Sequence, residues 1–116
     1  MDTKVIANEL KNNALYRESF GIPEVYMVGT SIEIDTLTYD KDYLPVDVQE
    51  VKVYIQSPLG EVLTISGEDI LTASGYEYCI YRPEIKGWHI YWVSVVDSLG
   101  LTSISNPIGF EVIDYN

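Results

Sequence analysis

The chain has 116 residues, with 18 acidic against 7 basic side chains and a single cysteine. This length suits one hydrophobic core, and a net charge of −11 argues against a surface that binds nucleic-acid phosphates. One cysteine cannot form an internal disulfide. No apolar run approaches the roughly 20 residues of a membrane helix, so we expect no membrane insertion. The first residues lack the pattern of a signal peptide, and we therefore expect synthesis in the cytoplasm.

The N-terminal segment differs in pattern from the rest of the chain. Ile6, Leu10 and Ala14 recur every four residues, which predicts a short helix or arm over residues 1–22. An isolated helix of this length is only marginally stable in water. We therefore expect it to dock through Ile6 and Leu10, either on its own domain (residues 23–116) or on a neighbouring subunit.

From residue 23 onward, apolar residues alternate with polar ones, which is the period of a β-strand. The expected strands are Glu24–Val28, Ser31–Thr38, Glu50–Gln56, Glu61–Ser66, Tyr76–Tyr81, Trp88–Val96 and a last strand interrupted at Asn106 and Pro107. We expect the first two to pair with each other. The turn at residues 57–60 should join the third and fourth as a hairpin. About seven short strands separated by turn residues are typical of an all-β sandwich.

Two segments carry a resemblance to a known group of domains. Gly87–Gly100, an aromatic-led alternating strand with its turn, and the ending Phe110–Val112 resemble the last two strands of bacterial and viral immunoglobulin-like domains. The alternation of Glu50–Gln56, with the turn that follows, is similar to their third strand and hairpin. The resemblance covers residues 23–113 and implies an immunoglobulin-like sandwich of the kind found in phage structural proteins. The lone Cys79 excludes the disulfide-paired antibody type.

Candidate catalytic residues are few. The only histidine, His89, lies in the middle of an expected strand, and no Gly-x-Ser-x-Gly motif presents a serine to it. Cys79 alternates with strand residues, as a small buried apolar side chain would. We therefore predict no enzymatic activity; the enzymatic alternative is a small hydrolase that uses clustered carboxylates.

Acidic side chains gather between Glu33 and Glu50, from the second expected strand to the start of the third. They are Asp35, Asp40, Asp42 and Asp47. Calcium takes several oxygen ligands from such loops, so one hypothesis is a calcium site. The alternative is a solvated acidic rim, because aspartate is common in any turn. We expect no other cofactor.

The strand Trp88–Val96 has apolar residues on both of its faces. In the register that the resemblance implies, His89, Tyr91, Val93 and Val95 point into the core. The outer face then carries Trp88, Ile90 and Trp92, beside Tyr54 of the third strand. Aromatic residues exposed together mark a surface for a partner.

Three explanations for this aromatic face remain open. The N-terminal helix covers it, another protein subunit docks on it, or a sugar stacks on its rings. We expect a non-catalytic assembly protein, a phage virion component such as a capsid decoration or head–tail or tail accessory subunit. It would dock through the arm and the aromatic face and reside in the virion after synthesis in the host cytoplasm. The alternative is a carbohydrate-binding or adhesive module that recognises a surface glycan.

Overall fold

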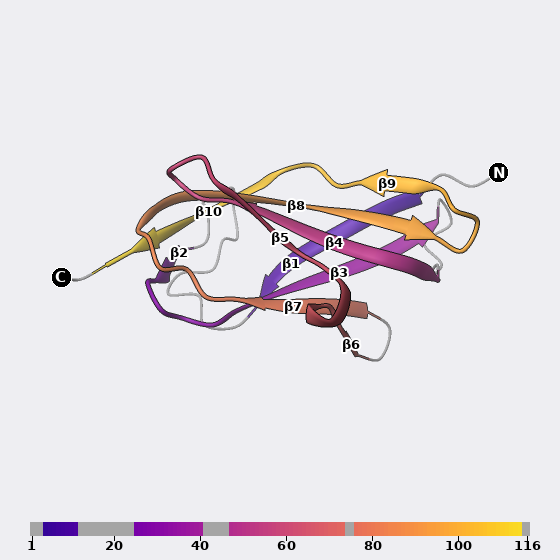
Figure 1. Ribbon diagram of the computed structural model, residues 1–116, viewed down its shortest axis with the longest axis horizontal. Helices are drawn as coiled ribbons and strands as arrows, with labels where there is room; N and C mark the ends of the chain where they lie inside the picture. Colours follow the sequence, from indigo (N-terminus) through magenta and orange to yellow (C-terminus); the bar gives the residue numbers. More distant parts are fainter. Residues whose placement is uncertain (1–3, 12–24, 41–46, 74–75, 115–116) are drawn as a thin grey trace.

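Two β-sheets packed face to face make up most of the described chain (Figure 1). The computed structural model describes residues 4–11, 25–40, 47–73 and 76–114. These residues contain ten strands and one 3-10 turn: β1 (Lys4–Lys11), β2 (Val25–Met27), β3 (Ile32–Asp40), β4 (Val48–Gln56), β5 (Val62–Ile65), η1 (Gly67–Asp69), β6 (Leu71–Ala73), β7 (Tyr76–Tyr81), β8 (Gly87–Asp97), β9 (Thr102–Ile104) and β10 (Ile108–Ile113). The all-β expectation is confirmed; the strand count of about seven is not.

The strands divide into a four-stranded and a six-stranded sheet. The first has the order β1-β3-β7-β6, and the second has the order β2-β10-β8-β4-β5, with β9 also paired to β8. All pairs are antiparallel except β2 with β10. The hairpin of β4 and β5 is confirmed, with Val53 opposite Ile65.

The expected pairing of the first two strands of the sandwich is wrong. β2 and β3 belong to different sheets, because the chain crosses between the layers after Met27. Val28 N–H donates to the carbonyl of Ile113, and Gly29 N–H donates to that of Pro83, each at about 2.9 Å or less. Gly29 has a φ of +86°, in the left-handed region that glycine adopts without strain. The segment after Met27 therefore connects the two sheets and does not form a hairpin of β2 with β3.

The N-terminal segment is not a helix where the structure describes it. Residues 4–11 form β1, which runs antiparallel to β3, with Ile6 opposite Thr38 and Leu10 opposite Ile34. A spacing of four residues fits a strand as well as a helix, since four is a multiple of the strand period of two. The edge of β3 supplies the backbone partners that decide between the two. Ala14 and the rest of the expected arm lie outside the described residues.

The last strand is interrupted where proline predicts. β9 pairs with residues 94–96 of β8 and β10 pairs with residues 87–91, so both continue along the same neighbour on either side of Pro107. Proline has no backbone N–H to donate to the ladder. β8 is thereby paired along both of its edges and becomes the central strand of its sheet.

The core lies between the two sheets. Its largest contributions come from β3, β4, β8 and β10, and the fully buried apolar side chains include Tyr26, Ile32, Ile34, Val53, Ile55, Cys79, Tyr91, Val93, Val95, Phe110 and Val112. The prediction that Cys79 is a small buried side chain is confirmed. Burial, with the carboxylate of Asp35 as a second cause, raises the pKa of its thiol to about 12, so it is protonated at neutral pH. The described part of the chain contains no helix with the length and hydrophobicity needed to cross a bilayer.

Candidate functional site

The alternation of β8 gives its two faces different roles. His89, Tyr91, Val93 and Val95 are buried between the sheets. Trp88, Ile90 and Trp92 therefore lie on the outer face of the six-stranded sheet. None of the three is fully buried, and Trp88 is 47% exposed. We call the set of Tyr54, Trp88, Ile90 and Trp92 the aromatic face.

Tyr54 and Trp92 form a cross-strand pair within the aromatic face. They are directly opposite each other in the β4–β8 ladder. Their ring centroids lie 5.5 Å apart with planes 14° from parallel, so the rings stack across the strands. One face of each ring is used by the other ring. Both side chains are partly exposed, so the pair presents apolar surface to a partner.

Trp88 lies over a glycine of the neighbouring strand. A Cβ atom at Gly109 of β10 would fall 2.0 Å from Cζ2 of the Trp88 indole. Only a residue without a side chain leaves that space to the ring. The indole thus covers the backbone of β10 with one side and keeps nearly half of its surface exposed. Gly109 was not recognised in the sequence, because nothing in its local context marks a ring above it.

A Gly109→Ala substitution should displace the Trp88 ring. We expect a red shift of tryptophan emission, measured in a Trp92→Phe background so that Trp88 is the single tryptophan. The change in unfolding free energy should stay below about 1 kcal/mol, since alanine favours the strand while the ring loses packing. Ser94→Ala on the same face is the control and should leave the emission unchanged. An unshifted spectrum for Gly109→Ala would show that the ring does not rest on Gly109.

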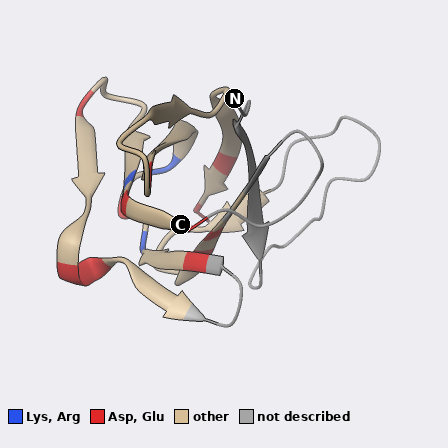
Figure 2. Cartoon of the chain, turned by 90° about the vertical axis from the view of Figure 1, so that its right-hand side faces the viewer, with Lys and Arg blue, Asp and Glu red and all other residues tan. Residues whose placement is uncertain are grey.

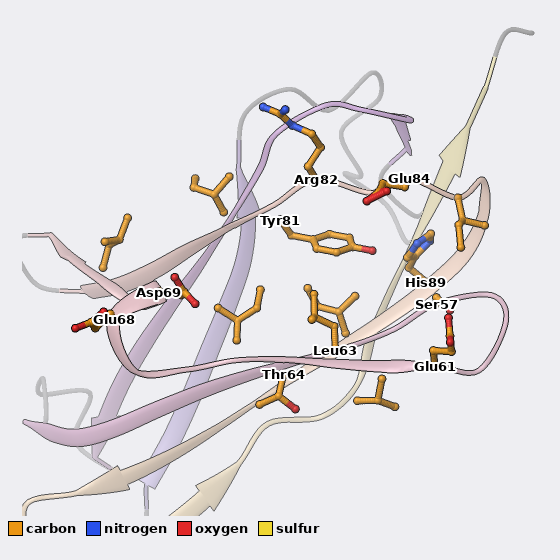
Figure 3. A pocket seen from close by; sticks show the side chains of 16 residues that line it. Ser57, Glu61, Leu63, Thr64, Glu68, Asp69, Tyr81, Arg82, Glu84 and His89 are labelled. Atoms are coloured by element: carbon orange, nitrogen blue, oxygen red, sulfur yellow. The ribbon is translucent and has the colours of Figure 1, made fainter.

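A cleft opens where the edges of the two sheets separate, beside β5 (Figure 3). Its volume is about 870 Å³, and Leu63 of β5 and Ile80 of β7 line its mouth with exposed apolar surface. Tyr81, Glu84 and His89 also line it; His89 is buried, whereas Glu84 is exposed. In Figure 3 the Tyr81 side chain reaches across the cavity toward His89. Sequence reasoning missed this cleft, because its lining comes from strands that only the fold brings together.

His89 is held in a defined orientation at the inner end of the cleft. Its Nδ1 lies 3.1 Å from the carbonyl oxygen of Gly87, and its ring stacks on Phe110 at 5.1 Å. A carbonyl can only accept, so Nδ1 donates and neutral His89 has a lone pair at Nε2. Nε2 is buried and has no hydrogen-bond partner among the described residues. Burial lowers the pKa of His89, against the opposing effect of the Gly87 carbonyl.

The lowered pKa of His89 makes the stability of the fold depend on pH. The folded state binds a proton less readily than the unfolded chain, so stability is complete above about pH 6.5 and falls as the pH decreases. The slope can reach about 1.4 kcal/mol per pH unit for one proton. We expect a His89→Phe variant to lose this slope between pH 6.5 and 5.5 in urea unfolding curves.

The difference between wild type and His89→Phe gives the contribution of the histidine to the pH dependence of stability. Burial raises the pKa of Glu77, which makes stability fall as the pH rises, the opposite direction. Both proteins contain Glu77, so the difference between their curves cancels its contribution. The chain has no second histidine. Equal slopes in wild type and His89→Phe would contradict a lowered His89 pKa.

The four aspartates proposed as calcium ligands differ in their surroundings, and one of them lies outside the described residues. Asp35 is buried in β3 and Asp47 is exposed just before β4. Asp40 ends β3, and Asp42 lies outside the described residues. Among the described residues, no group of three or more His, Cys, Asp or Glu side chains could hold a metal ion. The calcium site stays a prediction.

The sequence matches no protein-family model and no curated protein.

Proposed function

We propose that this chain is a non-catalytic assembly subunit with an immunoglobulin-like fold, a phage virion component that docks on other protein subunits through its aromatic face. A capsid decoration protein and a head–tail or tail accessory subunit are the forms we favour. The observation that carries the proposal is the set of partly exposed side chains Tyr54, Trp88, Ile90 and Trp92 on the outer face of the six-stranded sheet. Aromatic side chains are enriched at the centres of protein interfaces and contribute most of their binding energy.

Strand order supports the immunoglobulin-like part of the proposal. The order β1-β3-β7-β6 corresponds to strands A, B, E and D of that fold, and β10-β8-β4 corresponds to G, F and C. β5 then takes the place of the additional strand C′ of variable-type domains. The resemblance of Gly87–Gly100 to the penultimate strand of such domains agrees with the position of β8 in this order.

The charge distribution favours a partner on this face of the domain. The aromatic segment Trp88–Val96 has no charged residue. In Figure 2 acidic positions are more numerous than basic ones on the described part, and many lie at turns and strand ends. The uncharged segment is flanked on the same face by Glu111 of β10, opposite Trp88, and by Lys52 of β4, and a polar rim around an apolar centre is usual in protein interfaces. Ile6 and Leu10 of β1 stay predicted contributors to docking.

A carbohydrate-binding module is the second candidate, favoured by Trp88. Its indole lies over Gly109 with the opposite side exposed, which is a position where a sugar ring could stack. The Tyr54–Trp92 pair fits this function less well, because each ring uses one of its faces for the other ring.

Particle association and sugar titration separate the two functions. The assembly proposal expects the chain in purified virions after density-gradient sedimentation, detected by immunoblot. It also expects no change in tryptophan emission of the isolated chain upon addition of soluble polysaccharides. Saturable quenching by a polysaccharide, together with absence of the chain from particles, would replace the assembly proposal by the glycan-binding one.

A further inference from the structure

β5 is an edge strand with no protection against pairing. Among the described residues it pairs with β4 alone, and its sequence Val62–Ile65 contains neither lysine nor proline. Val62 and Leu63 are about half exposed, at 50% and 49%. Edge strands in natural proteins usually carry a charge, a proline or a bulge that prevents another strand from adding. Within the part of the chain that the structure describes, the outward backbone groups of β5 are thus open to an added strand.

The cleft beside β5 has an excess of negative charge. Carboxylates of Glu61, Glu68, Asp69 and Glu84 line it, against the single cation Arg82. The Arg82 guanidinium donates to Oγ of Ser31 at 3.0 Å, and in Figure 3 this side chain points away from the cavity. Clefts lined by one sign of charge concentrate ligands of the opposite sign.

The inner end of the cleft provides acceptors for a hydrogen-bond donor. Nε2 of His89 is a buried acceptor without a partner in the described structure, and an acceptor that is removed from water without a hydrogen bond is unfavourable. Glu84 lies close enough to Tyr81 for its negative charge to raise the pKa of the phenol, after the larger effect of burial. Tyr81 lies against His89, with ring centroids 6.1 Å apart. His89, Tyr81 and Glu84 line the same part of the cleft, where a hydrogen-bond donor from a ligand would meet an imidazole and a carboxylate (Figure 3).

We propose that this cleft binds an extended cationic segment of a partner polypeptide, which adds as a strand to β5 and places a lysine or arginine side chain between His89 and Glu84. Strand addition at an exposed edge is a common mode of peptide recognition, in which the backbone gives affinity and side-chain pockets give specificity. A lysine or arginine head supplies only donors and a positive charge, which complements an unprotonated imidazole nitrogen and a carboxylate that line the same cleft. Apolar side chains flanking the cation would contact Leu63 and Ile80.

This inference goes beyond the proposed function, because it concerns a second surface and the chemistry of its partner. It does not depend on what covers the aromatic face. Substitutions in the cleft should leave particle docking through Trp92 unchanged, and loss of that docking should leave peptide binding unchanged. The failures of the two proposals are therefore distinguishable.

Peptide titration tests the inference. The probe is a blocked seven-residue peptide of alternating threonine and valine with one central lysine, and its matched control has glutamate in that position. Isothermal titration calorimetry at pH 7.5 should give saturable binding of the lysine peptide, at least tenfold tighter than that of the glutamate peptide. Equal binding of both peptides, or none of either at 1 mM peptide, would overturn the proposal.

Three variants locate the binding site. Glu84→Gln should weaken binding of the lysine peptide at least fivefold, and Leu63→Lys should abolish it by placing a positive charge in the cleft. Glu111→Gln, which removes an equivalent exposed charge from β10, is the matched control and should change affinity less than twofold. Equal effects of Glu84→Gln and Glu111→Gln would show that binding depends on net charge and would overturn the assignment to the cleft.

A second copy of the chain is the competing occupant of the β5 edge. Light scattering after size exclusion would reveal it as a dimer that Leu63→Lys converts to a monomer. That result would overturn the proposal of a cationic partner segment. A monomer at all concentrations, together with the peptide result above, supports it. Circular dichroism of each variant confirms that the sandwich is folded.

Discussion

A Trp92→Ser variant is expected to lose incorporation into particles while keeping its folded structure. The Trp92 indole lies on the outer face of β8, where it stacks on the ring of Tyr54. The neighbours Tyr91 and Val93, which do occupy the core, are unchanged. A tryptophan at the centre of an interface typically contributes about 2–4 kcal/mol to binding, which corresponds to a 30- to 1,000-fold loss of affinity.

The stability of this variant should change far less than its docking. Loss of the ring pair removes about 0.5–1.5 kcal/mol, and serine is already present on the same face at position 94. Urea unfolding followed by circular dichroism measures the change in unfolding free energy. Immunoblots of gradient-purified particles measure incorporation. Leu59→Ser is the matched control, since Leu59 is 71% exposed in the turn after β4. It should incorporate normally.

Two outcomes would contradict the role of Trp92. If Trp92→Ser unfolds the domain, the ring belongs to the core and the outer face is not an interface. If the folded variant incorporates as well as wild type, the partner docks elsewhere on the molecule. The second result would leave the fold as described and remove the main support for the proposed function.

An Asp97→Ala variant is expected to lose about 3 kcal/mol of unfolding free energy. Asp97 ends β8 and is buried, and its Oδ1 accepts hydrogen bonds from the backbone N–H groups of Leu99 and Leu101, both at 2.9 Å. Its own N–H donates to the carbonyl of Leu101, and its carbonyl accepts from Gly100. Each bond to a carboxylate contributes about 1.5–3 kcal/mol, and alanine leaves the two turn donors without that acceptor.

The conservative and control variants of this turn define the mechanism. Asp97→Asn retains an acceptor oxygen and should lose markedly less stability than Asp97→Ala. Ser98→Ala, at the exposed next position, should stay within about 0.5 kcal/mol of wild type. Urea unfolding monitored by tryptophan fluorescence gives all three values. A loss below about 1 kcal/mol for Asp97→Ala would mean that solvent satisfies the turn donors equally well.

Local pattern was a good guide where one strand was considered at a time. Alternation located β4, β7 and β8, and the turn at residues 57–60 identified the β4–β5 hairpin. A period of two divides the residues of β8 between opposite sides, but which side faces the core came from the resemblance to immunoglobulin-like domains. Pattern failed for β1, where the spacing of Ile6 and Leu10 fits both periods and the partner strand is more than 20 residues away in sequence.

The candidate sites show the same division. The aromatic face could be predicted, since three of its members lie on one strand and Tyr54 lies on a strand with clear alternation. The Trp88–Gly109 contact and the cleft could not be predicted. The contact and the cleft each bring together residues of different strands, and which strands are neighbours depends on the strand order of the sheets. His89 appeared in the sequence only as an isolated histidine in a strand.

The amino-acid sequence by itself determined the all-β class, the position of most strands and the separation of an acidic periphery from an uncharged aromatic strand. These properties follow from residue periodicity and charge, which are local. Only the tertiary structure decided that β2 and β3 belong to different sheets, that residues 4–11 pair as a strand, and that His89, Tyr81 and Glu84 line one cleft. The physical reason is that the N–H and C=O groups at a sheet edge can pair with any strand of suitable length. The packing of the whole core selects which strand pairs there.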